Sequence, residues 1–373
     1  MKANFKYVMM MAAALVLGFS SCSNDNETSE PTDSAPKSVT IYVSNPSTYA
    51  EEESAVNKRP TIHDLNVYFI GAGVIKKTGT MASSDMAAGK TFDNVPGSAT
   101  DVVIIGNAER LSSPAVSTIA ANNPVSKLDA LMFKQDKQTD PTTDVNVHGR
   151  AVITEVAGVE TADITLAPAI SRLEIAKVEA KAGADIELSS FKLAGIYINN
   201  TYTECGTDYT TLPTAPTSIL NYDKDALVWT TDAASYPARF KDEWANPTAS
   251  TSFTPTAAGA TAWSYYIMPV VANKGTTIGG VVQTSVPHIT LKITDAKATG
   301  YILPNPAYVT VKELQVESTS LTALEKGKVY SIATLAIGGE NLAARPEVSA
   351  TQDVIVKATV TAWSGEAVDP IIP

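Results

Sequence analysis

The pattern of apolar and polar positions along this chain is typical of β-strands. Short runs rich in β-branched residues alternate between two faces, and Gly, Pro, Asn and Asp separate the runs. The first run places Val39, Ile41 and Val43 on one face. Residues 65–70 (LNVYFI) predict a second strand, and the unbroken apolar run 101–106 (DVVIIG) predicts a strand buried on both faces. The pattern therefore predicts an all-β protein with few short helices.

The middle of the chain adds one helical candidate and an expected division into domains. Apolar spacing through Val116 and Ile119 makes residues 111–134 the main candidate for helix. Residues 202–261, rich in Thr, Pro, Asp and Tyr, predict long surface loops. Further strands are expected over 170–180, 191–198, 263–271, 288–294, 309–316 and 328–337. The chain is long enough for two domains, and we expect their boundary near residue 166.

The last strong run, residues 353–363, predicts a long terminal strand. Val354, Val356, Ala358 and Val360 share one face and alternate with the residues of the other face. Most terminal strands close the domain to which they belong, and the pattern alone favours that interpretation. A terminal strand can also leave its sheet and pair with an open edge elsewhere. Both alternatives are open from the pattern.

The N-terminal segment has the anatomy of a secretory signal. Two lysines precede the apolar run 7–19, and two serines separate that run from Cys22. A cysteine directly after the small residues predicts a bacterial lipoprotein signal peptide over 1–21, with a lipid on Cys22. The alternative is an ordinary signal peptide followed by a chance cysteine. The polar, acidic residues 22–37 predict a flexible tether.

Composition and charge exclude several classes of function. The net charge of −11 argues against nucleic-acid binding, which requires basic patches. Besides Cys22 the chain has only Cys205, which we expect to be buried, so neither a disulfide nor a cysteine-based metal site is expected. His63, His148 and His288 are too widely spaced for a ligand pair. With no paired carboxylates or nucleophile–base setting either, we expect no catalytic site, metal or cofactor.

An aromatic cluster in the second half keeps a surface binding function open as the strongest rival hypothesis. Aromatic platforms bind sugars and proteins, although aromatic side chains are more often buried in cores. The cluster consists of Tyr222, Trp229, Tyr236, Trp244, Trp263, Tyr265 and Tyr266.

Several separated segments, in their order and spacing, resemble the fimbrillins, the pilus subunits of Bacteroidales. The resemblance begins with the lipoprotein signal ending at Cys22 and covers almost the whole chain. It is carried by VTIYV (39–43), LNVYFI (65–70), VVIIGNAERL (102–111), APAISRLEIAKVEA (167–180), FKLAGIYINN (191–200), GKVYSI (327–332) and VIVKATVTAW (354–363). No single segment is specific, but the series is.

The resemblance implies a fold and a mechanism. It implies two tandem transthyretin-like β-sandwich domains, here 38–166 and 167–373, without a catalytic centre. A fimbrillin precursor reaches the outer membrane as a lipoprotein, and an arginine-directed protease removes its first strand together with the lipid. The vacated groove then accepts an extended segment from the next subunit. Such a junction buries an apolar strand face and completes a hydrogen-bond ladder.

Carried over to this sequence, the removable strand is 39–43 and the donor segment is 353–363. The groove-filling residues would be Val39, Ile41 and Val43 in the first and Val354, Val356, Ala358 and Val360 in the second. The only basic residues of the loop between the first two strands are Lys58 and Arg59, which mark the expected cleavage region. Pro60 departs from the family's pattern, because proline after the scissile residue fixes φ and lacks an amide hydrogen.

The resemblance also implies partners and location. The partners would be neighbouring fimbrial subunits with tip and base subunits, the outer membrane through the lipid, and host or bacterial surface ligands. The precursor would be held at the outer membrane and the processed subunit would lie in an extracellular fimbrium. If the loop is not cleaved, the chain would instead be a lipid-anchored base subunit. An adhesive tip subunit is the remaining alternative within the family.

Overall fold

The computed structural model describes residues 35–44, 61–86, 88–108, 116–138, 145–209, 219–220, 222–223, 228–229, 240–257, 260–269, 277–278, 281–282, 286–346 and 354–362. Within these ranges the chain is mostly β-strand, as the sequence pattern predicts. No helix among these residues is long and apolar enough to cross a membrane.

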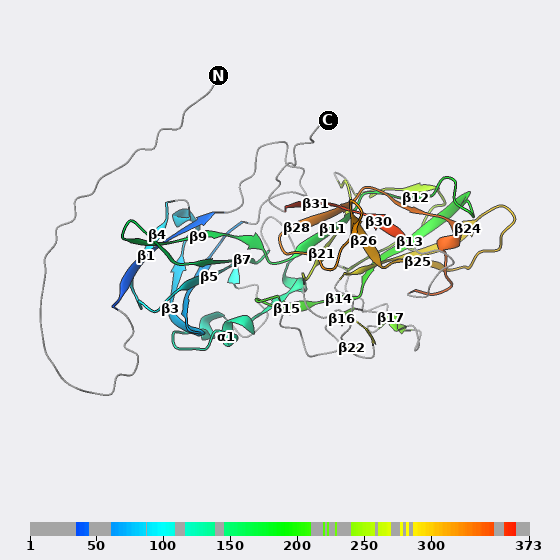
Figure 1. Cartoon of the computed structure of the whole chain (residues 1–373). Coiled ribbons are helices and arrows are strands. Elements are labelled where there is room, and N and C mark those ends of the chain that lie inside the picture. The colour runs from blue at the N-terminus through cyan, green and yellow to red at the C-terminus, as the bar shows by residue number, and fades with distance from the viewer. Residues whose placement is uncertain are drawn as a thin grey trace, which may run out of the picture. The chain divides into compact units, whose positions relative to one another are not determined.

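Two sheets form the first half of the described chain (Figure 1). One has the order β4 (Lys90–Val95), β1 (Lys37–Ser44), β9 (Val159–Thr165), β8 (Thr154–Val156). The other has the order β10 (Ala167–Pro168), β7 (Val147–Val152), β5 (Asp101–Gly106), β2 (Leu65–Gly71), β3 (Val74–Met81). The apolar faces of both sheets contribute to one buried cluster, so the pair forms a β-sandwich.

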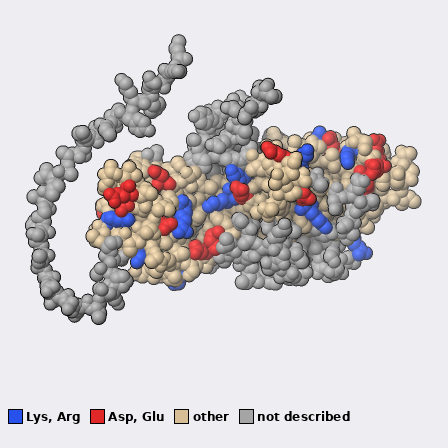
Figure 2. Space-filling view, in the orientation of Figure 1, with Lys and Arg blue, Asp and Glu red and all other residues tan. Residues whose placement is uncertain are grey.

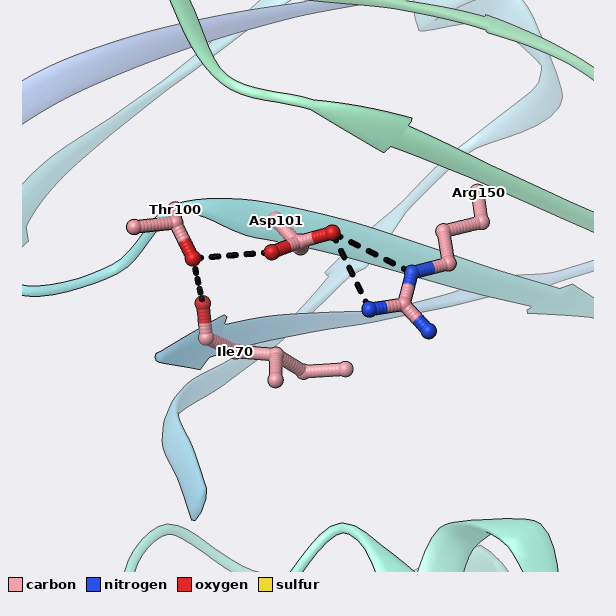
Figure 3. A network of polar contacts seen from close by, with 4 residues as sticks. All are labelled: Ile70, Thr100, Asp101 and Arg150. Atoms are coloured by element: carbon pink, nitrogen blue, oxygen red, sulfur yellow. Dashed lines mark hydrogen bonds and ion pairs between the residues drawn. The ribbon is translucent and has the colours of Figure 1, made fainter. Parts of the chain in front are cut away.

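A polar network joins three adjacent strands of the five-stranded sheet (Figure 3). Arg150 Nη2 and Nε donate to Asp101 Oδ1 at 3.0 and 3.2 Å. Thr100 Oγ1 lies 2.8 Å from the second oxygen of Asp101 and 3.5 Å from the carbonyl oxygen of Ile70. Because Arg150 is exposed, this ion pair contributes at most about 1 kcal/mol to folding stability.

The second half contains four further sheets of three or four strands. Their orders are β21 (Trp263–Ile267), β11 (Ser171–Ile175), β28 (Lys328–Ile332), β31 (Thr359–Ala362); β20 (Ser252–Phe253), β12 (Val178–Ala180), β29 (Leu335–Ile337); β19 (Lys241–Glu243), β13 (Ser190–Asn199), β24 (His288–Lys297), β25 (Ala307–Val311); and β27 (Thr319–Ser320), β26 (Glu313–Val316), β30 (Ile355–Lys357). All four contribute to a second large apolar cluster.

The same local topology occurs in both halves. β1 lies between antiparallel β4 and parallel β9, and β11 lies likewise between antiparallel β21 and parallel β28. β12 continues the arrangement with antiparallel β20 and parallel β29. The three antiparallel strands β2–β5–β7 of the first half correspond to β13–β24–β25 of the second.

A third apolar cluster contains residues of both halves. β6 (Met132–Lys134) pairs with β15 (Glu204–Gly206), which places Phe133 opposite Cys205. Both side chains are fully buried in this cluster, which confirms the expectation for Cys205. Burial also raises the pKa of the Cys205 thiol. The thiol is therefore protonated near neutral pH and is a poor nucleophile.

His148 on β7 and Lys326 meet beside this cluster. Lys326 Nζ lies 3.1 Å from His148 Nδ1 and 4.6 Å from the ring centroid of Tyr209. Burial, together with the positive charges of Lys326 and Arg150, lowers the pKa of His148 from 6.5 to about 3. The imidazole is therefore neutral at physiological pH and can accept a hydrogen bond from the Lys326 ammonium.

The structure corrects several sequence-based expectations. Residues 116–134 hold only the 3₁₀ turn Val116–Thr118, the single-turn helix α1 (Ser126–Asp129) and strand β6, and residues 111–115 lie outside the described part. The expected strand 170–180 is two strands, β11 and β12, that join different sheets. The described parts of 202–261 are not only surface loop, since Tyr202, Tyr209 and Phe240 are buried.

Short elements complete the described secondary structure. They are β14 (Thr201–Tyr202) with β16 (Ile219–Leu220), β17 (Tyr222–Asp223) with β18 (Val228–Trp229), β22 (Thr277–Ile278) with β23 (Val281–Val282), and 3₁₀ turns at Ser83–Asp85, Gln135–Lys137 and Gly339–Asn341.

Candidate strand-exchange site

Strand β1 fills the core of the first sandwich with its inner face. Val39 and Ile41 are fully buried and Val43 is 4 % exposed, whereas Tyr42 on the other face is 41 % exposed. Full burial of an aliphatic side chain of this size stabilises a fold by about 1.5–3 kcal/mol. The alternation predicted from the sequence is confirmed, and the core face of this strand is the expected one.

β1 is an inner strand of its sheet and is hydrogen-bonded along both edges. Val39 lies opposite Phe92 of antiparallel β4 and opposite Glu160 of parallel β9. The amide of Val43 also donates to the carbonyl of Met86 at 3.2 Å. Removal of β1 would therefore leave two facing strand edges and an open apolar slot between them.

Polar pairs fix β1 on its outer face. Ser38 Oγ donates to Asp93 Oδ1 at 2.7 Å, and the hydroxyls of Thr40 and Thr91 lie 2.9 Å apart. On the same face, the hydroxyls of Ser44 and Thr165 of the parallel neighbour lie 3.2 Å apart. At the start of the strand, Lys37 Nζ pairs at 3.1 Å with Glu160, which lies opposite Val39. These contacts reinforce the register of the strand. The buried apolar face already specifies it, since a slip by one residue would turn that face outward.

The C-terminal segment lies in the second half as two short strands. β30 pairs with β26 in parallel and β31 pairs with β28 in antiparallel fashion, so the expected single strand 353–363 is interrupted at Ala358 and crosses between two sheets. Val356 and Ala358 are 3 % and 5 % exposed, and Val354 and Val360 are half-buried against the same core. The apolar face is the predicted one, although the strand is not continuous.

β30 and β31 each lie at the edge of a sheet. Each therefore has strand pairing along one side, whereas β1 is paired along both. In this chain the segment closes the core of its own half, in agreement with the interpretation that the pattern alone favoured. Detachment of an edge strand breaks one ladder and leaves the rest of its sheet intact.

The two parts of the predicted site are not brought together in one chain. Val39, Ile41 and Val43 belong to the first apolar cluster, and Val356 and Ala358 belong to the second. Cys22, Lys58 and Arg59 lie outside the described residues, as do the ends of the segment 353–363.

Sequence reasoning missed the two strands that flank β1. Phe92 and Val95 of β4 and Ala162 and Ile164 of β9 are buried against the same core and would form the walls of the slot. A signal was present, because Ala162, Ile164 and Leu166 alternate with Asp163 and Thr165. Neither strand stands out in composition, since both carry polar residues on the outer face.

Charges of both signs are interspersed over the described part of the face shown in Figure 2. The described residues contain no group of three or more His, Cys, Asp or Glu side chains placed to hold a metal ion. The candidate site therefore consists of an apolar strand and the slot that it fills. The backbone N–H and C=O groups along the edges of the slot are the groups that bind the strand.

The comparisons with known proteins identify the fold. No family model and no curated relative matches the chain. Among solved structures, a "putative cell adhesion protein" of Parabacteroides distasonis ATCC 8503 aligns over 88 % of this chain and 100 % of its own, with TM-score 0.55 and 13 % identity. A fimbrilin of Porphyromonas gingivalis W83 aligns over 89 % and 99 %, with TM-score 0.52 and 10 % identity.

A second protein described as a "putative cell adhesion protein", from Bacteroides eggerthii DSM 20697, aligns over 90 % of this chain and 98 % of its own, with TM-score 0.50 and 14 % identity. These alignments span nearly the full length of each neighbour, so the likeness concerns the whole architecture. At such low identity they show a common fold, and the resemblance seen in the sequence is confirmed at that level. This chain has the fold of the Bacteroidales fimbrillins.

Proposed function

We propose that this protein is a non-enzymatic structural subunit of a cell-surface fimbria and polymerises by strand exchange. The observation that carries the proposal is the position of β1. It is an inner strand of its sheet, its Val39, Ile41 and Val43 side chains fill the core, and the segment 45–60 follows it directly. One cut in that segment would separate β1 from the rest of the chain. The fold shared with a fimbrilin and with two proteins described as cell adhesion proteins supports this role.

In this proposal the chain consists of two tandem β-sandwich domains, 38–166 and 167–373. The recurring placement of β1 and β11 between one antiparallel and one parallel neighbour supports the division. So does the distribution of two of the three apolar clusters, one drawn from residues 39–166 and the other from 173–358, whereas the third contains residues of both halves. The lipid on Cys22 holds the precursor at the outer membrane, and β1 keeps its assembly slot filled.

The donor in this proposal is the C-terminal segment of a neighbouring subunit. Val356, Ala358 and Val360 have the same two-residue period as Val39, Ile41 and Val43. The two valines carry β-branched side chains, which are favoured in strands. Thr359 would face outward, as Thr40 of β1 does where its hydroxyl meets that of Thr91. For exchange, β30 and β31 leave their sheet edges and straighten at Ala358 into one strand.

The N-terminal mass of the protein purified from the cell surface tests the processing step. We expect a processed subunit that begins near residues 59–60. Since Pro60 impedes cleavage after Arg59, we expect the Pro60→Ala variant to be processed faster. Lys58→Ala is the matched control, because it removes the alternative cleavage site after the lysine. If only lipid-bearing Cys22 termini are found, the protein is the lipid-anchored base subunit and not a polymerising one.

A pair of substitutions tests the donor segment. Val356→Asp places a charge on the inward face of the segment, whereas Thr359→Asp places the same charge at an exposed position. We expect only Val356→Asp to prevent polymer formation by processed subunits, because a charge cannot be buried in the apolar slot without several kcal/mol of cost. Thermal unfolding of each variant separates failure of exchange from failure of folding. Polymerisation of a folded Val356→Asp subunit at the unmodified rate would exclude this segment as donor.

A further inference from the structure

The described surface of the second half contains a pocket of about 180 Å³ lined by aromatic and uncharged polar side chains. Its apolar part consists of Leu193, Trp244, Pro247, Phe253 and Trp263. Its polar part consists of Asn246, Thr248, Thr254 and Thr256, all of which are exposed. A single water needs only about 10–15 Å³ of such space. The pocket is therefore large enough to admit a group of the size of one sugar ring.

Two indole rings form a corner of this pocket. The centroids of Trp244 and Trp263 lie 5.9 Å apart and the ring planes meet at 66°. Trp263 is 8 % exposed and belongs to the core of the second half, whereas Trp244 is half-buried. One indole is therefore a fixed wall, and the other keeps part of its surface open to a ligand.

The corner is held by hydrogen bonds and ring packing to neighbouring strands. The backbone amide of Trp244 donates to the carbonyl of Ala194 on β13 at 3.1 Å. Asp242, two residues earlier, accepts a hydrogen bond of 2.6 Å from Tyr265 Oη, and Phe253 packs on buried Phe191 with ring centroids 4.8 Å apart. A site held in this way loses little conformational entropy when a ligand binds.

We propose that this pocket binds one residue of a neutral carbohydrate. None of its lining residues carries a charge, which disfavours anionic and cationic ligands. Apolar rings with a few polar groups at the rim suit a ligand that has one apolar face and several hydroxyls at its edge. A sugar ring has both, and the Asn246 amide and three threonine hydroxyls supply donors and acceptors for its hydroxyls. A lipid chain would need a longer apolar tunnel.

This inference gives the proposed surface subunit a class of ligand, and it is tested on the single soluble chain without polymerisation. The full chain from residue 22 is titrated calorimetrically with the methyl glycosides of glucose, galactose, mannose and N-acetylglucosamine. We expect saturable binding of at least one glycoside, with Kd of about 0.1–1 mM, which corresponds to a weak single-residue site. A proline-rich peptide titrated in parallel tests the other class of ligand that aromatic grooves accept.

Variants locate the binding at the pocket. We expect Trp244→Ala and Asn246→Ala each to weaken binding at least tenfold, and Trp244→Phe to weaken it less because part of the aromatic surface remains. Tyr301→Ala removes an aromatic side chain that is 54 % exposed elsewhere on the chain, and it should leave affinity unchanged. No saturable binding of any glycoside, unchanged affinity in both Trp244→Ala and Asn246→Ala, or binding of the peptide alone would each overturn the proposal.

Discussion

Truncation of Ile41 in strand β1 is the most direct test of how the first sandwich is held together. Ile41 is fully buried, and its strand pairs with β4 on one side and β9 on the other. The adjacent residues of β1, Thr40 and Tyr42, face outward. Ile41→Ala removes three carbon atoms from the core, which at about 0.8 kcal/mol each amounts to roughly 2.4 kcal/mol of transfer free energy. The cavity left behind adds to this, so we expect a total loss of about 3–4 kcal/mol, within the usual range for such truncations.

The positions of the tryptophans allow this loss to be assigned to one half of the chain. All four tryptophans lie at residue 229 or beyond, so their fluorescence reports on the second half, whereas far-UV circular dichroism reports on both. In urea, with a slope of about 3 kcal/mol per molar, the midpoint of the first-half transition should fall by about 1 M. The fluorescence transition should stay where it is, because Ile41 belongs to the core cluster of the first half.

The matched control is Tyr42→Thr, on the opposite face of the same strand. Tyr42 is 41 % exposed, and threonine has a comparable strand propensity, so we expect a change within about 1 kcal/mol. Equal losses of unfolding free energy in Ile41→Ala and Tyr42→Thr would refute the inference that the inner face of β1 stabilises the first sandwich. A fluorescence transition that shifts together with the circular dichroism would show that the halves unfold as one unit, and the proposed boundary at residue 166 would then not be a folding boundary.

Two further predictions concern other parts of the fold. Since the pKa of His148 is lowered from 6.5 in the unfolded chain to about 3, its contribution to stability is complete above pH 6.5 and is lost as the pH falls toward 3, at up to about 1.4 kcal/mol per unit. Urea unfolding at pH 6.5 and 5 should therefore show a smaller pH-dependence for His148→Gln than for the unmodified chain, and equal dependence would contradict a neutral His148 beside Lys326. A Cβ at Gly71 would lie 2.1 Å from the carbonyl oxygen of Ser98, so Gly71→Ala should lower the thermal midpoint by several degrees, and an unchanged midpoint in calorimetry would contradict this close packing.

The sequence pattern predicted strands correctly where the apolar pattern was strong. It predicted the helix incorrectly, because the helical period there was short. Val39, Ile41 and Val43 were assigned to the core face correctly, because a two-residue period has only two possible faces. The run 101–106 was assigned to a doubly buried strand because its apolar residues are consecutive, and all residues after Asp101 are buried. The helical period over 116–120 failed, because those few residues are too short a segment to propagate a helix without a packing face.

For the candidate site, the sequence supplied the inward residues of β1 and of the C-terminal segment. It did not reveal the walls formed by β4 and β9, since a strand's partners depend on which distant segments fold beside it. It also did not reveal the break at Ala358, because alternation continues through that residue. The break follows from the separate edges offered by β26 and β28, to which the two pieces pair.

By itself the sequence determined that the chain is β-rich, which faces of its first and last strands are apolar, and that Cys205 has no cysteine partner beyond Cys22. These properties depend on local periodicity and composition, which any single segment carries. Only the tertiary structure decided that β1 is an inner strand while the terminal segment lies at two sheet edges, and that Trp244 and Trp263 meet at one corner. Strand order and side-chain clusters arise from contacts between residues far apart in the chain, and the free energy of those contacts is set by the whole packed core.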